Sequence, residues 1–215
     1  MSYLRTRLQQ GIETLGLDIP VETQIKLIKY IELIAKWNQK FNLTAVRNID
    51  DMLSLHLLDS LAVVPFISSN RVLDVGAGAG LPGIVLALCY PEKHFTLLDT
   101  NGKKTRFMTQ AKIELGLNNV EVVQARIDEY QPARQFDVII SRAFASISDI
   151  LGYVDHLVSS EEGAETTILA MKGDSEDEIS QMPERYKKAY QIERIHELEV
   201  PGLQARRQLL VINRY

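Results

Sequence analysis

The stretch Asp74-Val75-Gly76-Ala77-Gly78-Ala79-Gly80-Leu81-Pro82-Gly83 decides the fold of this 215-residue chain. It joins an apolar run, Val72–Val75, to an apolar segment, Ile84–Cys89, which predicts a strand, a tight loop and a helix. Glycine lets the backbone turn sharply and lets a ligand approach the main chain without a Cβ in the way. Pro82 suits the first helical turn, where its missing N–H is not needed. We therefore expect a ligand-binding loop at the end of this strand.

Strand and helix patterns alternate after the loop. Short apolar runs predict strands at His94–Leu98, Val120–Val123, Phe136–Ile140 and Thr166–Met171. Helices are expected over Lys103–Leu115, Ser148–Val158 and Asp174–Met182. The last two runs have no long helix between them and predict a closing antiparallel hairpin, Tyr190–Val200 with Gln208–Asn213. This order is typical of an α/β, Rossmann-like fold with a mostly parallel, doubly wound sheet.

The segment before the loop carries helical patterns instead. Apolar side chains recur near the helical period at Ile25, Ile28, Ile31, Ile34 and Trp37. Asp18 is expected to cap this helix, with Pro20 in its first turn, and a second helix is expected over Asp50–Val64. We therefore divide the chain into an N-terminal helical extension, residues 1–66, and a Rossmann-like domain, residues 67–215.

The composition excludes several classes of protein. Hydrophobic residues make up 46% and charged residues 24%, which rules out a disordered or fibrous chain. A single cysteine excludes a disulfide framework, and the four histidines are too dispersed to predict a metal site. No apolar run approaches the roughly 20 residues of a membrane helix, and the first residues do not resemble a signal peptide. We expect a cytoplasmic monomer without a metal or a membrane partner.

The charge distribution bears on nucleic-acid binding. The net charge is −4, which taken globally argues mildly against a phosphate-rich partner. However, 14 of the 28 acidic residues fall within residues 113–182, and residues 99–112 and 183–215 are each net basic. Local basic patches therefore remain, and we expect weak affinity for bare RNA that depends strongly on salt.

Two classes of ligand fit the glycine stretch. Gly78-x-Gly80-x-x-Gly83 matches the dinucleotide fingerprint, and Asp99 lies at the right distance to hold a ribose. Asp74-x-Gly76-x-Gly78-x-Gly80 equally matches the loop that binds S-adenosylmethionine. The carboxylate of Asp74 would repel a pyrophosphate but suits a cationic sulfonium-bearing amino acid. Only one mononucleotide-binding half is present, and the closing hairpin resembles that of class I methyltransferases. A methyltransferase is favoured, with a nucleotide-dependent oxidoreductase as the alternative.

The cofactor site predicted on this basis has three parts. Gly76, Gly78 and Gly80 would bind the cofactor, together with Asp74 at the end of the first strand. Asp99 would accept hydrogen bonds from both ribose hydroxyls, although it could also cap the following helix. The pair Ile127-Asp128, just beyond the third strand, would flank the adenine.

The residues after the fourth strand bear on the methyl acceptor. Enzymes that methylate exocyclic amines place an Asn/Asp-Pro-Pro-aromatic motif there, whereas this chain has Ser141-Arg142-Ala143-Phe144. Methylation of pyrimidine C5 requires a cysteine nucleophile, and the single Cys89 is expected to be a core residue. A guanine N7 fits, because its free lone pair needs positioning and electrostatics rather than a general base.

Further blocks of sequence carry a family resemblance over most of the chain. Besides the glycine stretch, they are Lys36-Trp37-Asn38, Asn42-Leu43-Thr44, His56-x-x-Asp59-Ser60, Leu98-Asp99, Lys103-Lys104-x-Arg106-Phe107, Ser141-Arg142-Ala143-Phe144-Ala145, Met171-Lys172-Gly173 and Arg206-Arg207-Gln208-Leu209-Leu210-Val211-Ile212. With these blocks the chain resembles the 16S ribosomal RNA guanine-N7 methyltransferase family, also called the glucose-inhibited division protein B family.

The resemblance implies a reaction and a set of contacts. It implies methyl transfer from S-adenosyl-L-methionine, leaving S-adenosyl-L-homocysteine, to N7 of guanine 527 in the 530 loop of 16S rRNA. The substrate would be this RNA within the 30S subunit or an assembly intermediate. Cofactor contacts are implied at Gly76, Leu81, Ile127, Asp128 and Arg142. Arg142 would also position the base as the catalytic residue, the alternative being an ion pair with a loop acid. A non-catalytic ribosome-binding module is a further alternative.

The remaining candidates concern RNA contact. The basic side chains expected to bind RNA phosphates are Lys103, Lys104, Arg106, Arg206 and Arg207. His56 and Asp59 share one helix face, where a polar contact to the core is favoured over a substrate contact. Trp37 and Phe41 are expected to be core residues rather than base-stacking platforms.

Overall fold

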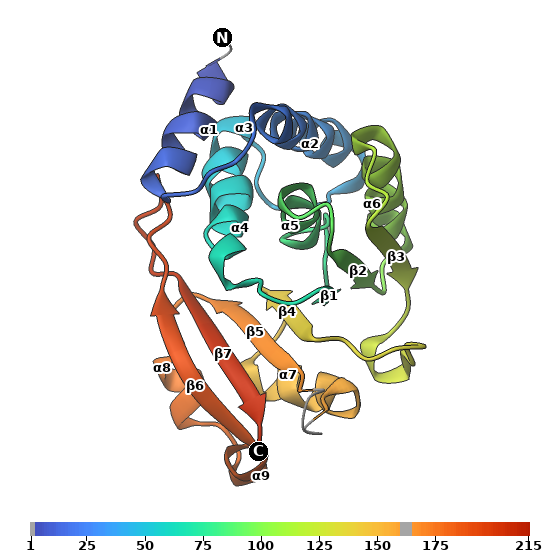
Figure 1. Cartoon of the computed structure of the whole chain (residues 1–215), viewed down its shortest axis with the longest axis vertical. Coiled ribbons are helices and arrows are strands. Elements are labelled where there is room, and N and C mark those ends of the chain that lie inside the picture. The colour runs from blue at the N-terminus through green and yellow to red at the C-terminus, as the bar shows by residue number, and fades with distance from the viewer. Residues whose placement is uncertain (1–2, 160–164) are drawn as a thin grey trace.

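The computed structural model describes residues 3–159 and 165–215, and within them seven strands form one sheet (Figure 1). The strands are β1 Arg71–Val75, β2 His94–Asp99, β3 Val120–Gln124, β4 Val138–Arg142, β5 Thr167–Lys172, β6 Tyr190–Glu197 and β7 Gln208–Arg214. Their order across the sheet is β3-β2-β1-β4-β5-β7-β6. Strands β1 to β5 are parallel, and β7 runs antiparallel to β5 and β6. The Rossmann-like fold with its closing hairpin is confirmed.

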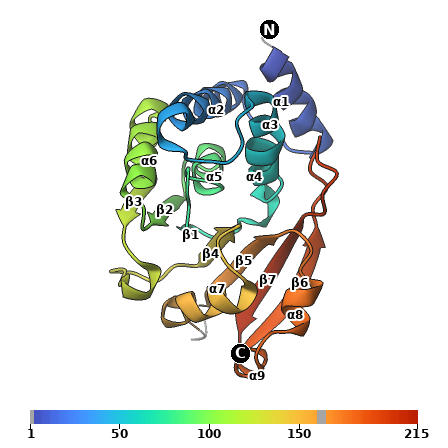
Figure 2. The same cartoon turned by 180° about the vertical axis from the view of Figure 1, so that it is seen from behind.

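Helices cover both faces of the sheet. Alternate strand residues point to opposite faces, so Val72 and Leu97 belong to one apolar cluster and Leu73 and Leu98 to the other. On the first face, α5 Gly83–Cys89 and α6 Gly102–Leu115 pack against the strands, and α2 Val21–Phe41 packs against these two helices. The helix α1 Tyr3–Thr14 packs in turn against α2. The second face packs against α7 Ile147–Val154, α8 Glu176–Ser180 and α9 Glu184–Ala189 (Figure 2). Because both faces are buried, the strands read as continuous apolar runs.

The N-terminal helices share their apolar cluster with the sheet. The ring of Tyr30 on α2 stacks on Phe107 of α6 at 6.5 Å between centroids, and Trp37 meets Phe107 edge-on at 5.5 Å. Trp37 therefore packs as a core residue, as expected, whereas Phe41 at the end of α2 is 37% exposed. The division at residues 66 and 67 stays a prediction. Among the described helices, none is long and apolar enough to cross a membrane.

One expected helix cap is wrong, and one alternative is removed. Pro20, not Asp18, is the N-cap of α2, because its carbonyl accepts the N–H of Gln24 while its own backbone stays extended. Asn101, not Asp99, caps α6, since its side chain accepts from the backbone N–H groups of Lys103 and Lys104. The alternative role of Asp99 as a helix cap is thereby removed.

The predicted helix over Asp50–Val64 is divided into three pieces. A short α3, Ile49–Met52, leads into a π-helical turn, Leu53–Leu58, and then into α4, Asp59–Leu61. In the wide turn, the backbone N–H of Asp59 bonds to the Ser54 carbonyl five residues earlier. Three predictions near the C-terminus also differ from the structure. The helix expected over Asp174–Met182 is only the five-residue α8, and α9 was not expected. The strand expected over Tyr190–Val200 ends at Glu197, as β6.

Candidate functional site

The glycine loop turns back over the carboxyl ends of β1 and β2. Gly76, Gly78 and Gly80 all have left-handed backbones, with φ of 67°, 61° and 85°. The Leu98 carbonyl at the end of β2 accepts the N–H groups of Gly76 (2.9 Å) and Ala77 (3.1 Å). A Cβ at Gly78 would meet nothing closer than the Gly76 carbonyl at 3.8 Å, so the space beside Gly78 is open. At Gly78 the loop therefore leaves its backbone open to the approach of a ligand.

Asp99 holds this loop in place. Its Oδ2 accepts the Gly78 N–H at 2.9 Å, and its Oδ1 accepts the Asn101 N–H at 2.8 Å. The Lys104 ammonium lies 3.8 Å from the same carboxylate. Each carboxylate oxygen carries two lone pairs, so both keep capacity for a further donor such as a ribose hydroxyl. Lys104, predicted to bind RNA, is instead placed beside the cofactor candidate Asp99.

A pocket of about 230 Å³ opens here, and we call it the loop pocket. It is lined by Gly76, Leu98, Asp99, Thr100, Lys104, Ile127, Ala143 and Phe144. The structure thus brings together Gly76, Asp99 and Ile127, which were predicted to hold the cofactor. Asp128 is not among the lining residues: its carboxylate pairs with Arg126 at 2.7 Å, and this hydrogen bond lowers the pKa of Asp128.

Asp74 lies beneath the loop and is fully buried. Its Oδ2 accepts the N–H of Gly83 at 2.8 Å, whereas Oδ1 has no hydrogen-bond partner among the described residues. Burial is the main cause that raises the pKa of this carboxyl to about 7. Because a carboxylate already takes the N–H at the start of α5, a pyrophosphate has no place there. This geometry argues against the dinucleotide alternative.

Tyr30 contacts the loop from α2, and Leu81 and Pro82 complete the loop before α5. The buried hydroxyl of Tyr30 on α2 donates to the Ala79 carbonyl at 2.5 Å, which ties the N-terminal helices to the loop. Leu81 is buried in the cluster beneath the loop rather than in the loop pocket. Pro82 is the N-cap residue of α5, one position before the first helical turn in which it was predicted. The sequence offered no signal for the role of Tyr30.

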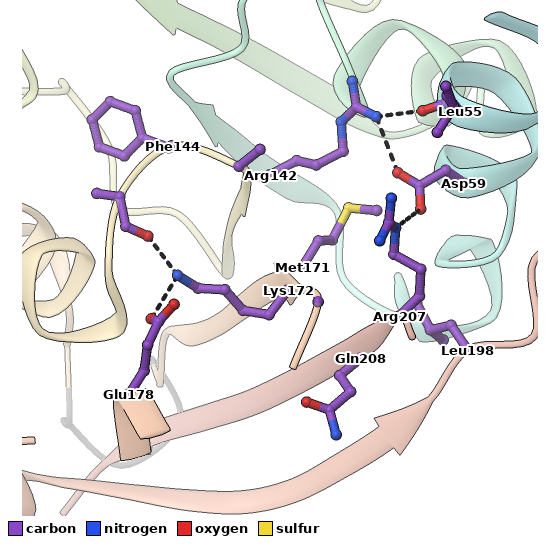
Figure 3. A pocket seen from close by; sticks show the side chains of 13 residues that line it. Leu55, Asp59, Arg142, Phe144, Met171, Lys172, Glu178, Leu198, Arg207 and Gln208 are labelled. Carbon is purple, nitrogen blue, oxygen red and sulfur yellow. Dashed lines mark hydrogen bonds and ion pairs between the residues drawn. The ribbon is translucent and has the colours of Figure 1, made fainter. Parts of the chain in front are cut away.

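A larger pocket of about 460 Å³ lies at the carboxyl ends of β4 and β5, and we call it the arginine pocket (Figure 3). Its lining residues are Leu55, Asp59, Arg142, Ala143, Phe144, Ala145, Met171, Lys172, Gly173, Glu178, Leu198, Arg207 and Gln208. Arg142 Nη1 donates to the Leu55 carbonyl (2.9 Å) and to Asp59 Oδ2 (3.0 Å). The ammonium of Lys172 pairs with Glu178 at 2.8 Å. Arg142 thus makes an ion pair with an acid of the N-terminal segment.

Phe144 stands between the two pockets. Together with Ala143, whose backbone is left-handed at φ 49°, it lines both the loop pocket and the arginine pocket. A Cβ added to Gly76 would lie 2.1 Å from Phe144 Cδ2, so the ring is seated directly on that glycine. Ligands bound in the two pockets would therefore lie next to each other at the Phe144 side chain.

The five basic RNA candidates have different surroundings. Arg207 lines the arginine pocket and pairs with Asp59 at 3.1 Å. Arg206, its neighbour, is outside that lining, and its guanidinium pairs with three carboxylates, those of Glu197, Glu176 and Asp174. Lys103 and Arg106 are exposed on α6. The structure therefore brings one of the five to the arginine pocket.

His56 and Asp59 lie in different surroundings. The His56 ring is buried and hydrogen-bonds through Nε2 to Thr44 Oγ1 at 3.0 Å, which is the polar contact that was favoured. Burial, assisted by the nearby Arg142, lowers the pKa of His56 to about 4, so this ring is neutral at pH 7. Asp59 instead lines the arginine pocket. Asp59 is an acidic residue within the apolar segment Leu57–Leu61. Such a position indicates that the carboxylate is buried and must face a cation.

Sequence comparison assigns a family. A family model described as rRNA small subunit methyltransferase G matches residues 23–211. The chain belongs to this family. A ribosomal RNA small subunit methyltransferase G from Stutzerimonas stutzeri is 48% identical over 210 residues, which cover 96% of this chain and 94% of the relative. A protein of the same name from Pseudomonas syringae pv. syringae is 47% identical over 208 residues, covering 96% and 94%.

Comparison of structures supports the fold. The crystal structure of a SAM-dependent methyltransferase from Aquifex aeolicus superposes with a TM-score of 0.56 at 21% identity. The match covers 76% of this chain and 94% of that one. At this identity the likeness concerns the Rossmann-like fold alone.

Proposed function

We propose that this protein transfers the methyl group of S-adenosyl-L-methionine to N7 of a guanine in 16S rRNA. The observation that carries the proposal is the meeting of two pockets at Phe144, one lined by Asp99 and Gly76 and the other by Arg142 and Arg207. Family membership adds the class of reaction, since the relatives at 47–48% identity are named rRNA methyltransferases.

The residues of the loop pocket fit the cofactor. Asp99 has acceptor capacity for ribose hydroxyls, Ile127 offers an apolar wall for the adenine, and the open backbone at Gly78 leaves room beside it. Beneath the loop, Asp74 Oδ1 is an acceptor without a donor among the described residues. When bound, S-adenosylmethionine supplies an electrophilic methyl group on a sulfonium sulfur and leaves as the neutral thioether.

The arginine pocket fits a nucleotide whose acceptor atom has a free lone pair. Among the described residues that line it there is no histidine, and its two carboxylates, Asp59 and Glu178, are both paired with cations, so none of them is a free general base. Catalysis would therefore rest on positioning and electrostatics, as N7 alkylation requires. Phe144 offers an aromatic face to a purine that becomes cationic on methylation. Arg142 and Arg207 supply positive charge for the RNA backbone.

The proposal includes the setting of the reaction. We take the substrate to be 16S rRNA within the 30S subunit or an assembly intermediate, and the enzyme to be a cytoplasmic monomer. Exposed Lys103 and Arg106 lie on α6, the helix that also carries the pocket residue Lys104, and would add phosphate contacts. Sedimentation of the free protein with and without purified 30S subunits would test the monomer and the complex together.

One experiment tests the reaction. The protein is incubated with S-adenosylmethionine carrying a labelled methyl group and with 30S subunits that lack N7-methylguanosine. We expect the label in N7-methylguanosine after digestion of the RNA, and much less of it when Asp99→Ala protein is used at a limiting concentration of S-adenosylmethionine. Label on another base, or no label with wild-type protein, would refute the proposed activity.

A further inference from the structure

Asp59 joins three distant parts of the chain at the wall of the arginine pocket. It stands at the start of α4, and its side chain is only 4% exposed. Its Oδ2 accepts from Arg142 Nη1 (3.0 Å), at the end of β4, and its Oδ1 accepts from Arg207 Nε (3.1 Å), just before β7. Figure 3 shows the two guanidinium groups directed at opposite oxygens of this one carboxylate.

The π-helical turn before Asp59 adds a second contact to Arg142. The Asp59 N–H bonds to the carbonyls of Ser54 and His56, and not to the Leu55 carbonyl that lies between them in the sequence. That carbonyl accepts the same Arg142 Nη1 at 2.9 Å. A carbonyl freed by a wide turn is a common feature of functional sites. The N-terminal segment therefore holds Arg142 at two points, through a side chain and through its backbone.

The arrangement leaves donors free on the pocket side. Within the described residues, Arg142 uses only Nη1 in hydrogen bonds, and Arg207 uses Nε and Nη1, the latter toward the Arg206 carbonyl. The other guanidinium nitrogens remain for a ligand. Two arginines and one aspartate leave this wall with a net charge of +1. Without the carboxylate, the two cations would repel each other and lose their common anchor.

We propose that Asp59 is a positioning residue for methyl transfer: it fixes Arg142 and Arg207 side by side, so that the target nucleotide is held against Phe144 in a reactive geometry. The inference rests on the proposed function, and it makes the N-terminal segment part of the active site. Asp59 acts through the arginines and does not itself touch the reacting atoms.

The test is Asp59→Asn, compared with wild type and with Asp155→Asn. Asp155 is likewise bonded to two partners, Tyr190 (2.7 Å) and Arg214 (3.4 Å), but neither lines the arginine pocket. We expect kcat for 30S methylation to fall about 10- to 100-fold in Asp59→Asn, as a misplacement near 1 Å does. The KM for 30S should stay equal or decrease, because the wall gains one positive charge. Asp155→Asn should keep both values.

A structural readout separates positioning from general damage. In wild type the Nε–H of Arg207 is bonded to Asp59, so its exchange with solvent should be slow by NMR and should accelerate in Asp59→Asn. A raised KM with unchanged kcat, or wild-type values of both, would overturn the proposal. If wild-type and Asp155→Asn proteins are both inactive, the proposed function fails, while the exchange measurement still reports on Asp59.

A second variant covers a loss of folding. Asp59→Glu keeps the charge and both ion pairs but moves the carboxylate by one methylene. We expect a folded protein by circular dichroism with kcat about threefold to tenfold below wild type, between the values of wild type and Asp59→Asn. Wild-type kcat in Asp59→Glu, with Asp59→Asn unfolded, would show that the carboxylate serves stability alone and would overturn the proposal.

Discussion

Replacing Asp99 with alanine removes the acceptor at the centre of the loop pocket. The carboxylate is 6% exposed and accepts the N–H groups of Gly78 (2.9 Å) and Asn101 (2.8 Å). A hydrogen bond to a charged group contributes roughly 1.5–3 kcal/mol, so losing one net bond of this kind to the ribose should weaken cofactor binding by about 1.5–3 kcal/mol. This corresponds to a rise of about 10- to 150-fold in Kd for S-adenosylhomocysteine.

Isothermal titration calorimetry with S-adenosylhomocysteine measures this loss, and Asp137→Ala is the matched control. Asp137 Oδ2 also accepts two backbone N–H groups, those of Asn70 (3.0 Å) and Arg71 (2.9 Å), but at the amino end of β1. Both variants should be less stable to thermal unfolding, because each frees two backbone donors. Only Asp99→Ala should lose affinity. An unchanged Kd in Asp99→Ala would remove Asp99 from the cofactor site and refute the reasoning.

Three further predictions use other parts of the site. Burial raises the pKa of Asp74 from 3.8 to about 7, so between these pH values the folded protein keeps a proton that the unfolded chain loses. The contribution of this proton to the stability of the folded state is full below about pH 4 and is lost as the pH rises through 7. The free energy of unfolding of wild type relative to Asp74→Asn, from denaturant titrations, should therefore decrease by up to about 4 kcal/mol over this range; a flat difference would contradict it. Gly76→Ala should impair both activity and S-adenosylhomocysteine binding, because its Cβ would lie 2.1 Å from Phe144 and its φ is 67°; normal calorimetric affinity would show that the loop adapts. Arg207→Gln should lower 30S methylation at least about tenfold, because Arg207 is bonded to Asp59 at the arginine pocket. Arg206→Gln should stay near wild type, because three carboxylates outside the pocket lining hold Arg206. Equal losses in a methyl-transfer assay would contradict the placement of Arg207 alone at the pocket.

The loop and the sheet were predictable because their signals are local. The glycine positions in Gly76–Gly80 reflect left-handed backbones that few other residues adopt, and the parallel strands are apolar on both faces. The six-residue α9 was missed because none of its residues is fully buried, so no apolar period marks it. The alternative of Asp99 as the cap of α6 fails because the helix begins at Gly102, which places Asn101 at the N-cap position.

The arginine pocket was less predictable because its contacts join residues far apart in the chain. Asp59 meets Arg142 and Arg207 only after the sheet and hairpin have formed, and the π-helical turn that frees the Leu55 carbonyl has no pattern of its own. Neighbouring Arg206 and Arg207 have the same chemistry in the sequence. Which of them faces the pocket depends on where the acids of β6 and α8 lie in the fold.

The most direct test of the account is the modified nucleotide itself. Ribosomal RNA is purified from cells that lack this protein and from the same cells carrying the wild-type or the Asp99→Ala gene, and digested fragments of 16S rRNA are analysed by mass spectrometry. We predict that one N7-methylguanosine disappears without the protein, returns with wild type and returns to a lower level with Asp99→Ala. An unchanged N7-methylguanosine content in cells without the protein would contradict the central claim.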